Sequence, residues 1–75
     1  MNSRGQQASV PQAKLVRLLN LINELRKQSL TINQIMERYD VSKRTAYRYV
    51  DIIELCDIPI EQDFKRRYYI AKENG

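Results

Sequence analysis

The chain has 75 residues, 43% of them hydrophobic, and a formal net charge of +4 at pH 7. A chain of this length forms at most one small domain, and its composition is that of a folded protein rather than a disordered one. The single Cys and the absence of His exclude an internal disulfide and a Cys/His metal site, and no apolar stretch approaches the roughly 20 residues of a membrane span.

The first ten residues, MNSRGQQASV, are small and polar and show no periodicity, which predicts a disordered tail over residues 1–10 or the remnant of an affinity tag. Pro11 suits the first turn of a helix, so the folded domain is expected over residues 11–71. A first helix is predicted from about residue 12 to 28 because of apolar residues at helical spacing: Leu15, Leu18, Leu19, Ile22 and Leu25. Val16 and Leu21 widen this stripe, so the helix either packs on several elements or also forms a dimer contact, and core packing is favoured.

A second, short helix is predicted over residues 32–39 from an amphipathic set of side chains: Ile32, Ile35, Met36 and Tyr39. Thr31 and Gln34 fit a capping box, in which each side chain satisfies a free backbone N–H at the helix start. Leu30 is expected in a short extended segment before this helix. Asp40 predicts a tight turn after it, because Asp tolerates the left-handed conformation.

A third helix is predicted from about residue 43 to 56, with Ser42 as its N-cap. Helical projection gives this segment two faces. The inner face carries apolar residues and small ones, among them a Cys that is expected to be buried: Ala46, Tyr49, Val50, Ile53 and Cys56. The outer face is mostly basic and aromatic, with two residues at its edges near the N-terminus: Arg44, Tyr47, Arg48 and Asp51, edged by Lys43 and Thr45.

The remaining residues predict a β-hairpin. Ile58–Gln62 and Arg67–Ala71 show the alternation and the residue types of strands, and the charged segment 63–66 between them predicts the tip. Three side chains are expected to face the core: Ile60, Tyr68 and Ile70. Phe64 is expected to pack against the hairpin, and residues 72–75 are expected to form a frayed C-terminal tail.

The positive charge is concentrated in two short segments. Residues 42–50 and 65–72 contain none of the nine acidic residues and more than half of the 13 basic ones. The basic residues in these segments are Lys43, Arg44, Arg48, Lys65, Arg66, Arg67 and Lys72. Charge of one sign that is focused in this way is typical of a surface that binds a polyanion.

Helix, short helix, tight turn, helix and two-stranded hairpin is the order of a winged helix-turn-helix domain, so the predicted fold is mainly α, with three helices followed by a β-hairpin wing. Residues 30–55, LTINQIMERYDVSKRTAYRYVDIIEL, resemble the helix-turn-helix of bacterial transcription regulators, above all the N-terminal domains of the DeoR type and of WYL-domain regulators. The step Val41-Ser42-Lys43-Arg44-Thr45 matches their V-S-x-R-T step, and Ile58–Ala71 is similar to their wing. Such regulators usually carry a C-terminal sensor domain, so the chain is expected to be a fragment or a small stand-alone regulator.

The resemblance implies that the third helix enters the major groove of double-stranded DNA and that the wing, about 58–71, contacts the backbone or the minor groove. The DNA-binding residues that it implies are Ser42, Lys43, Arg44, Thr45, Tyr47, Arg48, Lys65, Arg66 and Arg67. Arg44 and Arg48 are the candidates for base contacts, because Arg forms bidentate hydrogen bonds with guanine. The chain departs from the usual family pattern in having Asp40 where Gly is common, Tyr49 where Asp is common, and no Gly in the wing.

We therefore expect sequence-specific binding of double-stranded DNA in a transcription regulator or a mobile-element protein. A homodimer fits this expectation, because one small module supplies few base contacts. Two other functions stay open, a winged-helix module for protein–protein contact within a larger assembly and a module that binds structured RNA. No enzymatic activity is expected, because the sequence has no His, no glycine-rich phosphate loop and no nucleophile beside a base. We also expect a cytoplasmic protein without a cofactor or a membrane partner.

Overall fold

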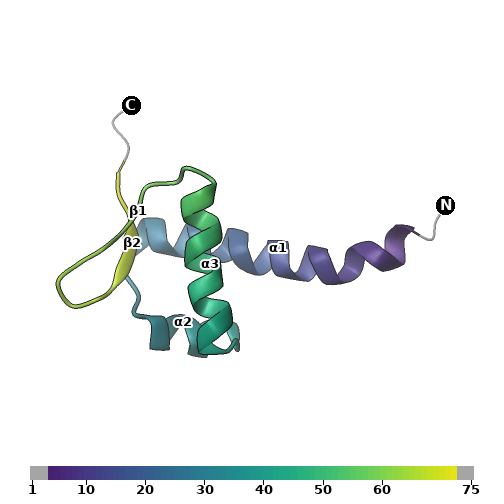
Figure 1. The fold of residues 1–75 in the computed structure, drawn as a ribbon, viewed down its shortest axis with the longest axis horizontal. Helices are drawn as coiled ribbons and strands as arrows, with labels where there is room; N and C mark the ends of the chain where they lie inside the picture. The colour runs from purple at the N-terminus through teal and green to yellow at the C-terminus, as the bar shows by residue number, and fades with distance from the viewer. Residues whose placement is uncertain (1–3, 73–75) are drawn as a thin grey trace.

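The structure is a computed structural model that describes the backbone of residues 4–72 and the side chains of residues 12–72. Its elements in chain order are α1 (Arg4–Lys27), α2 (Ile32–Tyr39), α3 (Lys43–Leu55), β1 (Ile60–Gln62) and β2 (Tyr68–Ile70), as Figure 1 shows. Three helices followed by one antiparallel hairpin confirm the predicted winged helix-turn-helix fold. Within residues 4–72, no helix combines the length and the apolar character that crossing a membrane requires.

The first helix is longer than the sequence predicted. It begins at Arg4 rather than near residue 12, so residues 4–10, which were expected to be disordered, form its first turns, and residues 1–3 of the expected tail lie outside the described residues. Periodicity missed this segment because it detects an apolar face, whereas residues 6–8, QQA, are helix formers without such a face. Pro11 therefore lies inside α1, where it removes one backbone donor, instead of starting the helix.

The core lies where the C-terminal half of α1 meets α2, α3 and the hairpin. Its largest fully buried side chains come from α1, the following linker, α2 and α3: Leu21, Leu25, Leu30, Ile35 and Ile53. The remaining core residues are Ile32, Ala46, Tyr49, Val50, Ile60 and Ile70. The predicted inner face of the third helix is therefore confirmed for Ala46, Tyr49, Val50 and Ile53.

The caps of α2 are those that the sequence predicted. Thr31 Oγ1 accepts the Gln34 N–H at 3.1 Å, and Gln34 Oε1 accepts the Thr31 N–H at 2.9 Å. The helix ends at Asp40, whose φ of 53° and ψ of 52° place it in the left-handed region. The backbone N–H of Asp40 donates to the Met36 carbonyl, so the turn satisfies a free carbonyl of the last helical turn.

Glu24 ties α1 to α2. Its Oε1 accepts a hydrogen bond from the Tyr39 hydroxyl at 2.6 Å, and its Oε2 forms an ion pair with Arg38 and accepts from the Gln28 amide at 2.9 Å. Burial and the hydrogen bond to Glu24 raise the pKa of the Tyr39 hydroxyl well above its usual value. Tyr39 therefore keeps its proton and stays a donor to this carboxylate over the physiological pH range.

The hairpin is joined to the helices by a third extended residue. β1 and β2 are antiparallel, with Ile60 opposite Ile70. Leu30 pairs with Tyr68 in an isolated bridge, in which the Leu30 N–H donates to the Tyr68 carbonyl at 2.9 Å and the Tyr68 N–H donates to the Leu30 carbonyl at 2.7 Å. The extended segment predicted at Leu30 is thus confirmed, and so are the inward positions of Ile60 and Ile70, whereas Tyr68 is half-buried.

Two side chains lie where the sequence did not predict them. Cys56 is exposed, because α3 ends at Leu55 and Cys56 is its C-cap, so it no longer follows the inner face of the helix. Phe64 is 89% exposed instead of packed, because it lies in the turn between the strands, beyond the part of the hairpin that covers the core. Periodicity indicates the face of an element, but it does not fix where the element ends.

Candidate nucleic-acid interface

The start of α3 is held in a fixed conformation. Ser42 has extended dihedrals, φ −72° and ψ 165°, and its Oγ accepts the Thr45 N–H at 3.1 Å while its hydroxyl donates to Thr45 Oγ1 at 3.2 Å. This confirms the predicted N-cap. Ala46, one turn into the helix, is fully buried. The first turn of α3 is therefore fixed both by its cap and by the core.

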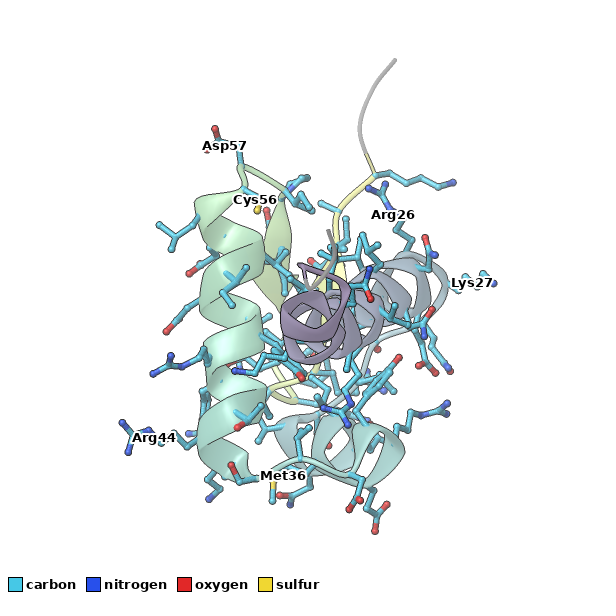
Figure 2. All side chains as sticks on the ribbon, turned by 90° about the vertical axis from the view of Figure 1, so that its right-hand side faces the viewer. Arg26, Lys27, Met36, Arg44, Cys56 and Asp57 are labelled. Carbon is cyan, nitrogen blue, oxygen red and sulfur yellow. The ribbon has the colours of Figure 1, made fainter. Side chains whose placement is uncertain are left out.

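The opposite face of α3 is exposed to solvent, as predicted. Lys43, Arg44, Tyr47 and Arg48 are all exposed, and Asp51 lies on the same face near mid-helix. In Figure 2, Arg44 points away from the body of the domain, on the side opposite Lys27 of α1. Among the described side chains Arg48 forms no ion pair with Asp51, so its guanidinium remains available to an external partner.

Charge is distributed unevenly along α3. The N-terminal half carries Lys43, Arg44 and Arg48, whereas Asp51, Glu54 and Asp57 lie in and just after the C-terminal half. Burial raises the pKa of the Tyr68 hydroxyl above its usual value, and the nearby Tyr47, Glu54 and Asp51 raise it further. The carboxylates of α3 therefore also act on the hairpin through their charge. An anion is therefore favoured at the N-terminal half, where the helix macrodipole is also positive.

On one flank of α3, a groove of about 490 Å³ separates it from α1. The lining residues are Lys14, Leu15 and Leu18 of α1 and Arg44, Thr45, Arg48, Tyr49 and Ile52 of α3. Lys14 lines this groove together with Arg44 and Arg48, so α1 adds a third basic residue beside α3. Sequence reasoning missed Lys14, because its position beside α3 depends on how the two helices cross.

On the other flank, a hollow of about 220 Å³ lies between α3, the start of α2 and the wing. Its lining residues are Thr31, Ile32, Asn33, Lys43, Tyr47, Gln62 and Arg66. Lys43 and Tyr47 thus line the hollow beside the wing, whereas Arg44 and Arg48 line the groove beside α1, with the Arg44 side chain extending outward (Figure 2). Asn33 and Gln62 were also missed, and the only sequence signal for them is that both are polar and adjoin predicted element ends.

The wing tip is organised around Asp63. Its Oδ1 accepts the backbone N–H of Lys65 and that of Arg67, both at 2.9 Å, and its Oδ2 pairs with Arg67 Nε at 2.9 Å. These bonds, the one from the Arg67 N–H above all, hold the pKa of the Asp63 carboxyl below its usual value. The Asp63 carboxylate thus holds the turn through its hydrogen bonds, and it engages the side chain of Arg67.

The other two basic residues of the tip remain exposed. Arg66 has a φ of 64°, which is unusual for a residue other than glycine, and its side chain reaches the hollow beside Lys43. Lys65 Nζ lies 5.7 Å from the centre of the Phe64 ring. Of the nine predicted contact residues, Ser42 caps α3, the five on α3 and Arg66 line the two hollows beside this helix, Lys65 lies at the tip, and Arg67 is paired with Asp63.

Comparison with known proteins agrees with this architecture. A family model described as an HTH domain matches residues 15–70, from the middle of α1 to the end of β2. Neither a curated protein nor a solved structure matches the chain. The family match includes α2, the turn at Asp40, α3 and the hairpin, which are the elements that carry the exposed basic surface.

Proposed function

The chain belongs to the helix-turn-helix domain family and is a DNA-binding domain, and from this premise we propose that it binds specific sequences of double-stranded DNA with α3 in the major groove. The observation that carries the proposal is the exposed basic face on the N-terminal half of α3. That face stands on a helix whose cap and inner face are fixed. A fixed helix is what base recognition requires, because hydrogen bonds to base edges tolerate little error in position.

The proposal gives the exposed residues different roles. Arg44 and Arg48, one turn apart, read bases, because each guanidinium can form two hydrogen bonds with a guanine. Lys43 and the free N–H groups behind the Ser42 cap bind phosphate, supported by the positive end of the helix dipole. Lys14 adds a phosphate contact from α1, since it lines the same groove as both arginines.

In the same proposal the wing contacts the backbone or the minor groove beside the site that α3 reads. Lys65 and Arg66 are exposed at the tip and carry these contacts. Arg67 contributes less directly, because its Nε is bound to Asp63. Tyr47 lies between Lys43 and the wing and can donate its hydroxyl to a phosphate there.

The proposal also covers the role of the protein. It acts in the cytoplasm as a transcription regulator or a mobile-element protein, without a catalytic step, and it binds its site as a homodimer. The sequence supports a binding role because it contains no His that could serve as a general base at neutral pH. A dimer is favoured because a single module of this size makes too few base contacts for high specificity.

The test begins with in vitro selection of bound duplexes from a random pool, which identifies the site. Fluorescence anisotropy with that duplex at moderate salt then compares Arg44→Ala and Arg48→Ala with the wild type. Each substitution is expected to weaken binding by about 5- to 150-fold, because a bidentate base contact contributes about 1–3 kcal/mol of discrimination. The loss should be larger for the selected duplex than for a scrambled one.

The matched control is Lys27→Ala, which removes one exposed positive charge on the side of the domain opposite Arg44 (Figure 2). It should change affinity only slightly, and equally for both duplexes. If Arg44→Ala and Arg48→Ala behave like this control, α3 is not the recognition helix. Stronger binding of a structured RNA than of the selected duplex in direct competition would overturn the choice of DNA duplex as the partner.

A further inference from the structure

The tip of the wing carries an aromatic ring that the domain does not cover. Phe64 is 89% exposed, more than any other large apolar side chain that the structure describes. Two exposed basic residues, Lys65 and Arg66, follow it, and Figure 1 shows that the loop between β1 and β2 projects away from the helices. The ring therefore takes no part in the core and is free to enter a partner.

The turn that carries Phe64 is held by hydrogen bonds across it. The Asp63 N–H donates to the Arg67 carbonyl, and the Arg66 N–H donates to the Asp63 carbonyl, each at 2.9 Å. The Asp63 carboxylate also accepts the N–H groups of Lys65 and Arg67. Phe64 thus projects from a backbone of defined conformation. Such a backbone favours insertion into a partner, because it has little conformational freedom left to lose on binding.

The charges around the ring indicate the chemistry of that partner. Lys65 Nζ lies 5.7 Å from the centre of the ring, and the Arg66 side chain is exposed beside it. The Asp63 carboxylate is already paired with Arg67 Nε, so it leaves these two cations without a partner in the turn. An apolar protein surface would desolvate both cations without pairing them. The minor groove of a DNA duplex instead offers phosphates along its edges and stacked base faces between them.

The tip also lies beside the part of α3 that the proposed function places on DNA. Arg66 lines the same hollow as Lys43 and Tyr47, which belong to the N-terminal half of α3. When this half of α3 occupies the major groove, the tip next to it meets the adjacent backbone and minor groove. A ring at the tip therefore reaches base pairs that α3 does not contact.

We propose that Phe64 is a wedge that inserts from the minor groove between two neighbouring base pairs and bends the duplex towards the major groove, around α3. This inference rests on the proposed binding of double-stranded DNA, and it adds a residue that determines bending and specificity. Insertion unstacks one base step, and kinks of this type measure about 20–90°. Unstacking costs least at the flexible pyrimidine–purine steps TA and CA/TG. The bound site should therefore have such a step beneath the wing.

Bending of the selected duplex by the full chain is the first test. Energy transfer between dyes at the two ends of the duplex should show that the wild type bends it by about 20° or more. Phe64→Ala should bind this duplex without bending it, whereas Phe64→Leu keeps an apolar wedge and should retain most of the bend. The matched control, Leu55→Ala, removes an exposed apolar side chain from α3 and should bend DNA like the wild type. Equal bending by the wild type and Phe64→Ala, or no bending by either, would overturn the proposal.

The unstacked step can be located with a fluorescent adenine analogue whose emission rises when it leaves the stack. Placed in turn at each adenine outside the α3 contacts, the analogue should brighten at one step only, and Phe64→Ala should abolish the increase. Replacing that step by the stiffer AA should weaken wild-type binding by about fivefold or more and Phe64→Ala binding far less. Arg66→Gly removes a charge but keeps the ring, so it should retain the preference for the flexible step. An unchanged preference in Phe64→Ala would contradict the wedge.

Failure of the wedge and failure of DNA recognition give different results. If Arg44→Ala weakens binding while Phe64→Ala leaves the bend and the step preference unchanged, α3 recognises DNA and the wedge is wrong. If the wild type binds no selected duplex, the proposed function fails and the wedge fails with it. Binding of single-stranded DNA that is tighter than that of the duplex and depends on Phe64 would also overturn the wedge, because the ring would then stack on unpaired bases. Circular dichroism should show that Phe64→Ala is folded, since the exposed ring supports no core contact.

Discussion

The two basic segments of the chain look alike in sequence, but they differ in structure. The N-terminal half of α3 presents Arg44 and Arg48 from a capped helix whose inner face is buried. The wing tip presents its basic residues from a turn that a single carboxylate holds, and that carboxylate engages Arg67 as well. Basic residues that look equivalent in the sequence therefore differ in how firmly they are held and in how available they are to a partner.

In the proposed function, this difference gives the two regions different roles. Base recognition requires donors in fixed positions, and α3 supplies them from a helix that the core positions. Phosphate contacts tolerate variation in position, because a phosphate presents several oxygens, and the exposed Lys65 and Arg66 suit them. Four sets of variants, in decreasing order of their expected effect, test this contrast.

Truncating the side chain that holds α3 to the core should have the largest effect on stability. Ile53 is completely buried, so Ile53→Ala should lower the free energy of unfolding by about 2–5 kcal/mol, from lost burial and the cavity left behind. Leu55→Ala, two residues further and exposed, should change it by less than about 0.5 kcal/mol. Urea denaturation followed by circular dichroism measures both. Similar values for the two variants would show that the core does not anchor α3.

Removing the cap of α3 should have a smaller effect. Ser42→Ala should lower the free energy of unfolding by about 1 kcal/mol, because the Thr45 N–H loses its acceptor. Ser42→Asp keeps an acceptor at the cap and should restore most of this stability, but its negative charge faces the proposed phosphate and should weaken DNA binding. Denaturation and anisotropy together separate the two effects. If Ser42→Asp binds DNA as tightly as the wild type, no phosphate lies at this cap.

At the wing, relieving the backbone strain at Arg66 should change the free energy of unfolding by less than removing the Ser42 cap does. Its positive φ favours glycine, so Arg66→Gly should be more stable than Arg66→Ala by at most about 1 kcal/mol. Both variants lack the charge, so both should lose the same phosphate contact. Thermal unfolding measures the difference in stability, and the salt dependence of binding measures the contact, whose loss should reduce the slope by about one. Equal stability of the two variants would show that the left-handed position carries no strain.

The pH dependence of the wing should be the most local effect. The pKa of Asp63 is lowered in the folded state, so its carboxylate stabilises the tip at neutral pH, and this contribution is lost as the pH falls through the lowered pKa. The amide signals of Lys65 and Arg67 in NMR spectra should therefore shift at acidic pH, because both N–H groups donate to this carboxylate. Asp63→Asn keeps the Oδ1 acceptor without the titration, so it should abolish the shift. A shift that persists in Asp63→Asn would assign the effect to another group.

Local features of the fold could be predicted from the sequence. The capping box at Thr31 and Gln34, the left-handed Asp40 and the Ser42 cap all depend on residues within four positions of each other. The inner face of α3 followed from its period for the same reason. The early start of α1 could not be predicted, because no apolar face marks the polar residues before Pro11.

The parts of the site that the sequence did not reveal depend on contacts between distant segments or on the geometry of a turn. Lys14 lines the groove with Arg44 only because α1 crosses α3 there. Arg67 counted as a free cation in the sequence, although the hairpin tip folds Asp63 back onto it. Leu19 and Leu25 are equally apolar in the pattern, and only the packing shows that one is exposed and the other buried.

The bridge between Leu30 and Tyr68 also sets an order of events during folding. The caps and turns of α1, α2 and α3 are local and can form as soon as these residues are available, whereas Leu30 finds its partner only after Tyr68 has been synthesised. The corner between α1 and α2 thus remains hydrated until the last strand docks. We expect the amide of Leu30 to gain protection from hydrogen exchange together with β2 and later than the amides of α3, so the last strand made completes the first corner of the domain.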